Sequence, residues 1–322
     1  MEITLEEQKK LRNACLPLMQ LNNIECCKHL LDKFIDSYLV IMKKHHYDPV
    51  STQSEADNRI WFQMMMSKAL NIKNVLDGIE YDNGTAYLNR IIDPTILLTL
   101  VRNLFEAICA FEIVTIIPDT QEKKLILYNL YCISGFGFRQ RFFSPNLPEK
   151  YKLKLLDEKE YIQELITEIK NTELYKSLRD KERSKLDNAI KGKNYQISIN
   201  SENQVKSYGW GDIPPLFGIK PMFYKNIYTY FCLNAHPSHI SMIQFRDMFK
   251  PGEEEYIRIS VTTMKFCFML LSIYLSDYIK LFPQIKNTYE NFPVEDQILL
   301  NFHNKLSRGD EYSISDKWKM LG

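Results

Sequence analysis

The sequence carries almost no net charge, and it lacks the composition of a disordered chain. Its 322 residues include 41 Lys and Arg against 40 Asp and Glu, which leaves a formal net charge of +1. No global electrostatic field therefore draws the chain onto nucleic acid or an anionic membrane. A local basic patch is compatible with this charge, and nothing in the sequence points to DNA. The hydrophobic share of 45% predicts a globular chain with a substantial core.

Signals for export or membrane insertion are also missing. The first residues, MEITLEEQKKLRN, do not show the basic-then-apolar order of a secretory signal. The seven cysteines are odd in number, and most fall in apolar helical patterns, so we expect no disulfide framework. Val261 to Phe282 is the one segment to test as a membrane span, but Lys265, Asp277 and Lys280 interrupt it. We expect a buried core helix there, with membrane contact as the alternative, and a cytoplasmic location.

The common catalytic signatures are absent. The chain has no Gly-rich phosphate loop, no dinucleotide fingerprint, no Gly-x-Ser-x-Gly elbow and no His-Glu-x-x-His zinc helix, so we expect no cofactor. We also expect no metal site, because Cys26-Cys27-Lys28-His29 lacks the paired ligand spacing of structural zinc. The His45-His46 pair follows two lysines at a helix end, where cations complement the helix dipole.

Helical periodicity is what the sequence does have. Apolar residues recur every three or four positions from Ile24 to Met42, a range that includes Phe34 and Leu39. The segment from Thr52 to Asp77 repeats the pattern, through Ile60, Met64, Leu70 and Val75. We count about nine or ten helices and at most a short strand pair, near YQISINS, and no alternation of strands with helices. The sequence therefore predicts an all-α fold, an irregular multi-helix bundle.

The composition changes after Pro145. Residues 151–191 are dense in Lys, Glu and Asp, which predicts one or two exposed helices on a narrow apolar seam, and residues 194–221 read as an ordered loop. We expect a single domain over residues 1–322, with a charged helical arm and an aromatic, Gly- and Pro-rich loop inserted at residues 145–221. A solvated helical hairpin is the simplest interpretation of the arm, and a partner-binding arm is the alternative.

Two groups of residues could carry chemistry. Arg102 and Glu106 are four positions apart within an apolar helix, so they form either an intrahelical ion pair or the wall of a polar cavity. A proline-marked helix junction brings a second group together in the chain, namely Asn234, His236, Ser238 and His239. His236 is either a structural histidine, bonded for example to Glu106, or a general acid or base.

These elements resemble a group of bacterial all-helical proteins that pair an Arg-x-x-x-Glu helix with a later His-Pro-Ser element. Here they are Arg102 to Glu106 and His236-Pro237-Ser238, preceded by the loop Tyr208-Gly209-Trp210-Gly211. Such proteins look distantly like the HEPN superfamily, helical domains of which many cut RNA in toxin–antitoxin and antiphage-defence systems. The likeness implies an HEPN-like helical core. No Arg in this chain precedes a His by four to six residues, as HEPN nucleases require, so Arg102 and His236 would form a composite site.

Three hypotheses follow. The first is a helical binding protein of a bacterial stress or antiphage-defence system, which contacts a protein or RNA through Tyr208, Trp210, Ser238 and His239. The second is a metal-independent ribonuclease with His236 as general acid or base, Arg102 as phosphate clamp, and Glu106 and Asn234 to orient them. The third is a membrane-associated helical protein. Each of the three hypotheses is compatible with a homo-oligomer.

Overall fold

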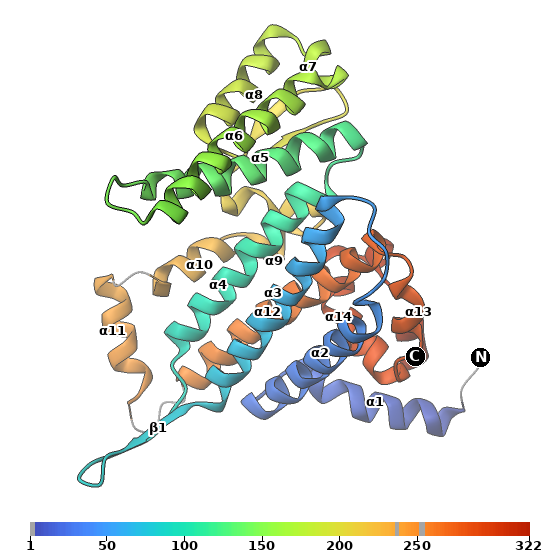
Figure 1. The fold of residues 1–322 in the computed structure, drawn as a ribbon. Coiled ribbons are helices and arrows are strands. Elements are labelled where there is room, and N and C mark those ends of the chain that lie inside the picture. Colours follow the sequence, from blue (N-terminus) through green and yellow to red (C-terminus); the bar gives the residue numbers. More distant parts are fainter. Residues whose placement is uncertain (1–3, 236–237, 251–254) are drawn as a thin grey trace. The chain divides into compact units, whose positions relative to one another are not determined.

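The computed structural model describes residues 4–235, 238–250 and 255–322. It is built of helices with two short antiparallel strand pairs (Figure 1), so the all-α prediction is confirmed. The described residues form fourteen α-helices, more than the nine or ten expected. The excess includes α7, α9 and α13, which have only four to six residues. Helices this short do not complete two turns, so apolar periodicity cannot reveal them.

The chain forms two compact units, Met1–Ile108 with Gly218–Gly322 (unit 1) and Cys109–Phe217 (unit 2). The first part of unit 1 is helical except for one hairpin. Side-chain oxygens of Thr4, Asn23 and Thr52 cap the first three helices by accepting backbone N–H bonds. The elements are α1 (Leu5–Gln20), α2 (Ile24–His45), α3 (Gln53–Asp77), β1 (Ile79–Asp82), β2 (Tyr87–Ile91) and α4 (Pro94–Phe111).

The second part of unit 1 supplies the central helix of its core. Of the most apolar window of α12, 78% is buried, so the prediction of a buried helix at Val261 to Phe282 is confirmed; this is the single described helix long and apolar enough to cross a membrane. Tyr38 of α2 donates its hydroxyl to the carbonyl of Leu271 at 2.9 Å. The elements are α9 (Pro221–Tyr224), α10 (Ile227–Ala235), α11 (His239–Met248), α12 (Glu255–Leu281), α13 (Ile285–Glu290) and α14 (Val294–Arg308), then two short 3-10 turns (Asp310–Tyr312 and Lys317–Leu321).

The buried charge that interrupts α12 is neutralised by a partner on α14. Asp277 and Arg308 are each about 1% exposed, and Arg308 Nη1 bonds to Asp277 Oδ2 at 2.5 Å. Lys280 bonds to the other carboxylate oxygen at 3.0 Å. Asn304 accepts a further hydrogen bond from Arg308 Nε at 2.7 Å. This network makes an acidic residue compatible with a core helix, because a buried charge is tolerated when it is paired and hydrogen-bonded.

The sequence predicted the wrong side of α3 as its buried face. Ile60, Met64 and Leu70 are 54%, 46% and 41% exposed, and on α2 Leu39 is 47% exposed. The buried stripe of α3 consists of other residues, namely Asn58, Trp61, Phe62, Met65, Met66, Ala69, Ile72 and Leu76. Apolar residues surround α3 on more than half of its circumference, and a period of 3.6 then fixes the helix without fixing which side faces the core.

The helical periodicity did not predict the β1–β2 hairpin, which turns at Asn83-Gly84. Tyr81 pairs with Leu88 across the two strands, and Ile79 pairs with Ile91. Asn83 Oδ1 accepts backbone bonds from Thr85 and Ala86, which closes the turn. β1 alternates apolar and polar residues over only four positions and β2 does not alternate, so the segment is too short to give a clear strand signature.

Unit 2 contains most of the predicted arm and loop, together with the helix before them. Thr120 caps α5, and Glu122 accepts the backbone N–H groups of Glu173 and Leu174 at the start of α7. Leu165 and Ile169 of the predicted seam are buried, whereas Leu156 is 50% exposed. The elements are a π-helical turn (Glu112–Ile116), α5 (Gln121–Arg139), α6 (Glu149–Asn171), α7 (Glu173–Ser177), α8 (Asp180–Gly192), β3 (Ile197–Ile199) and β4 (Val205–Ser207), with 3-10 turns at Gln140–Phe142, Trp210–Asp212 and Pro214–Phe217.

Candidate functional site

Arg102, Glu106 and Tyr228 form a closed hydrogen-bonded cluster within unit 1. Arg102 and Glu106 lie one turn apart on α4, and Arg102 Nε donates to Glu106 Oε1 at 2.9 Å. Tyr228 of α10 accepts a bond from Arg102 Nη2 at 2.9 Å and donates its hydroxyl to Glu106 Oε1 at 3.3 Å. The ion pair expected within one helix is present, and α10 supplies a third member.

The charges of this cluster are partly buried and mutually stabilised. The side chains of Arg102 and Glu106 are 19% and 27% exposed. Burial opposes the charge of Arg102, but the hydrogen bond and charge of Glu106 raise the pKa of the guanidinium. Burial and then the charge of Glu106 raise the pKa of Tyr228, so its phenol stays protonated and serves as a donor. A phosphate group would have to compete with Glu106 for the guanidinium.

The predicted partners of Arg102 after α10 are only partly visible. His236 and the side chain of Asn234 lie outside the described residues, so their distance from Arg102 stays a prediction. Ser238 caps α11 in a capping box, in which its Oγ accepts the N–H of Ser241 at 3.1 Å and Ser241 Oγ accepts its N–H at 2.8 Å. His239 is the first residue of α11 and is exposed. The hydroxyl of Ser238 is thus committed to the helix start.

Tyr208 and Trp210 belong to unit 2, where the aromatic loop is ordered. The hydroxyl of Tyr208 lies 3.0 Å from Ser198 Oγ, and Lys206 Nζ lies 5.0 Å from the centre of its ring. Trp210 begins a 3-10 turn and is half-buried. Ile213 and Phe217 further along the loop are buried, so much of its apolar surface already packs within unit 2.

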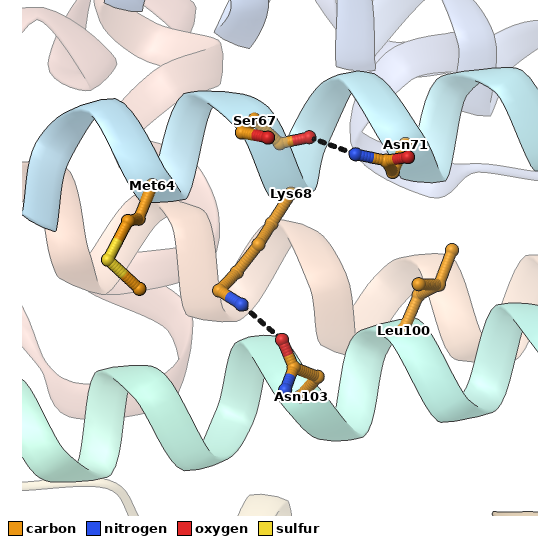
Figure 2. Close-up of a pocket in the computed structure, with 6 residues that line it drawn as sticks. All are labelled: Met64, Ser67, Lys68, Asn71, Leu100 and Asn103. Carbon is orange, nitrogen blue, oxygen red and sulfur yellow. Dashed lines mark hydrogen bonds between the residues drawn. The ribbon is translucent and has the colours of Figure 1, made fainter. Parts of the chain in front are cut away.

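A second polar cluster on α4 was not predicted. Figure 2 shows Lys68 of α3 directed at Asn103 of α4, and Lys68 Nζ donates to Asn103 Oδ1. The two side chains line a cavity of about 240 Å³ with Met64, Ser67, Asn71 and Leu100. Burial lowers the pKa of Lys68, which has no carboxylate within 4 Å in the part of the chain that the structure describes. A lone lysine on an apolar helix gives no sequence signal, so only the packing of α3 against α4 reveals it.

Metal chemistry finds no support in the described ranges. Within residues 4–235, 238–250 and 255–322, no three His, Cys, Asp or Glu side chains gather around one point as metal ligands would. None of the seven cysteines, all within the described residues, forms a disulfide, and Cys15, Cys27, Cys109 and Cys267 are buried as small hydrophobes.

Comparison with known proteins supplies no relative from which to transfer a function. The likeness to the HEPN superfamily therefore stays an expectation. No protein-family model, curated protein sequence or solved structure compared with this chain matches it.

Proposed function

We propose that the chain is a helical binding protein that contacts a protein partner through the β1–β2 hairpin. The observation that carries this proposal is the exposed apolar face of that hairpin. Ile79, Tyr81 and Leu88 are 65%, 64% and 44% exposed, and Tyr81 and Leu88 are cross-strand neighbours. Large apolar side chains that gather on an exposed two-stranded element are typical of a recognition surface. The bacterial stress or antiphage-defence setting and the cytoplasmic location are part of the proposal, and they rest on the resemblance and on the sequence.

Charge favours a protein over RNA as the partner at this surface. The strands carry Glu80 and Asp82 against one basic residue, Arg90. Tyr87 donates its hydroxyl to Glu80 at 3.2 Å on the exposed surface of the hairpin. A net negative hairpin repels a phosphate backbone, whereas it suits an apolar protein surface with a basic rim.

The test is affinity capture from a lysate of the source cells with the full chain as bait. We expect one protein to be recovered in stoichiometric amount by the wild type and lost by the double variant Tyr81→Ser/Leu88→Ser. The matched control is Tyr151→Ser, because Tyr151 is also 55% exposed but lies on α6. Recovery that does not depend on the hairpin would refute this surface, and recovery abolished by ribonuclease treatment would replace the protein partner with RNA.

A metal-independent ribonuclease with a composite Arg102/His236 site is the alternative. It requires Arg102 to exchange its bonds to Glu106 and Tyr228 for a substrate phosphate. Incubation with total RNA in EDTA distinguishes the two functions. Cleavage by the wild type that a folded Arg102→Ala variant loses would establish the ribonuclease, and the binding proposal would then fall.

A further inference from the structure

A cavity of about 290 Å³ lies in unit 1, where α2 ends and α3 begins. Its walls are mostly apolar and include Ile41, Ile60 and Phe62. Arg59 and Tyr278 line the same cavity and bring the chemistry of a guanidinium and a phenol. The partial exposure of Ile60, which contradicts the predicted face of α3, has its explanation here, because Ile60 forms part of a cavity wall.

Arg59 is a cation without a carboxylate partner. Its Nη2 donates to the carbonyl of Pro49 at 3.1 Å, and its Nη1 reaches the carbonyl of His46 at 3.5 Å. Among the residues that the structure describes, no carboxylate oxygen lies within 4 Å of its guanidinium nitrogens. Carbonyl groups use up N–H donors but carry no net charge, so no direct ion pair neutralises the guanidinium, and the charge of Asp48 acts on it only from beyond 4 Å.

Asp48, in the loop between α2 and α3, bonds to His45 and not to Arg59. Asp48 Oδ2 bonds to His45 Nδ1 at 2.7 Å, and His45 Nε2 bonds to Thr288 Oγ1 at 2.7 Å. The hydrogen bond to His45 lowers the pKa of Asp48. This chain of bonds fixes the end of α2 against α13 and holds His45 at the cavity wall.

Tyr278 adds a second donor to the cavity. Its side chain is almost completely buried, at 4% exposure, and burial raises the pKa of the phenol, so it stays protonated. Its hydroxyl has no hydrogen-bond partner among the described residues. As a lining residue, Tyr278 offers a protonated hydroxyl that can donate to an acceptor in the cavity.

We propose that this cavity binds a small organic carboxylate with an apolar body. The guanidinium and the phenol supply donors for the carboxylate, and Ile41, Ile60 and Phe62 contact the body. One cation matches a single negative charge, whereas a phosphate dianion needs more than one. At about 30 Å³ per water-sized atom, the volume holds about ten non-hydrogen atoms, so hexanoate and benzoate are suitable probes.

The test is titration of the full-length protein with hexanoate and benzoate, followed by NMR or calorimetry. Hexanamide and benzyl alcohol are the neutral counterparts, and inorganic phosphate tests for simple anion binding. We expect each carboxylate to bind at least about tenfold more tightly than its neutral counterpart, because charge-assisted hydrogen bonds are the stronger kind. Arg59→Gln should abolish this preference and Arg59→Lys should keep most of it. Arg12→Gln, which removes an exposed charge of the same unit, should leave it unchanged.

Two results would overturn the proposal, namely carboxylates that bind no better than neutral probes or phosphate, and an Arg59→Gln variant that keeps the preference. Arg59 also fastens the loop at Pro49, so circular dichroism must show that its variants keep their helices. Should Arg59→Gln unfold, Ala56→Phe decides, because it fills the cavity and leaves the guanidinium in place. Retained binding in that variant refutes the site, and lost binding in a folded variant supports it.

Discussion

Acid should destabilise this protein through one buried histidine, His303 of α14. Its side chain is 6% exposed, it stacks against Phe268 at 5.9 Å between ring centres, and its Nε2 has no hydrogen-bond partner among the described residues. Burial, aided by the charge of Lys265, lowers its pKa from 6.5 to about 3. The folded state therefore keeps His303 neutral, while the unfolded state takes up a proton below pH 6.5.

The sign and size of the effect follow from linkage. Because the folded pKa is depressed, the unfolded state binds more protons between pH 6.5 and pH 3, and the free energy of unfolding falls as the pH falls. The loss approaches about 1.4 kcal/mol per pH unit, which amounts to about 2 kcal/mol at pH 5.0 relative to pH 8. At pH 5.0 most carboxylates are still ionised, and comparison with a variant that lacks His303 separates its contribution from that of the other five histidines.

Urea denaturation from pH 8 to pH 5 measures this loss. His303→Phe should flatten the pH dependence by about 2 kcal/mol over that range, since it cannot titrate. His29→Gln is the matched control, because His29 is exposed on α2 and its removal should leave the slope unchanged. A wild-type protein and a His303→Phe variant with equal slopes would refute the reasoning.

Three further predictions concern the fold. Asp277→Asn should lower the free energy of unfolding by about 3–5 kcal/mol in urea denaturation, because it leaves the Arg308 charge buried, and adding Arg308→Met should restore part of the loss. Gly78→Ala should lower the free energy of unfolding by about 1–2 kcal/mol in urea denaturation, since Gly78 has φ of +75° and a Cβ there would lie 2.9 Å from Arg90. Gly135→Ala in α5, where a Cβ has open space, should instead raise the free energy of unfolding by about 0.5–1 kcal/mol. Tyr228→Phe should lower the melting temperature by several degrees, because about 1–2 kcal/mol of hydrogen bonding between α10 and α4 is lost. An unchanged melting curve would show that these bonds do not stabilise the packing of α10 on α4.

The sequence was sufficient for the fold class and for the position of the long helices, because both depend on local patterns. Phe34 lies on the predicted face of α2 and is fully buried, and at the start of α4 Asp93, an acid followed by a proline, accepts a bond from the N–H of Thr95. The face of α3 was wrong because apolar side chains on several of its sides leave the phase of the stripe undecided. The partner of each apolar face is set by packing between distant segments, which periodicity does not encode.

The candidate sites divide in the same way. The pairing of Arg102 with Glu106 follows from their spacing on one helix, but Tyr228 is 126 residues from Arg102 and could not be found by spacing. Arg59 and Lys68 gave no signal, because Arg and Lys are common on helix surfaces, and what distinguishes them is that no carboxylate among the described residues lies within 4 Å of either. A missing partner is a property of the packed structure.

The division of unit 1 into two chain segments has a consequence for its synthesis. The hydroxyl of Tyr38 bonds to a carbonyl 233 residues later, at Leu271, and all of unit 2 and a large part of unit 1 must be made between them. At about 5–20 residues per second, the ribosome reaches Leu271 roughly 10 to 50 s after Tyr38. Throughout that interval the aromatic face of α2 has emerged without the helix that covers it. The nascent chain therefore needs protection by a chaperone, or by temporary contacts of its own, before unit 1 can close.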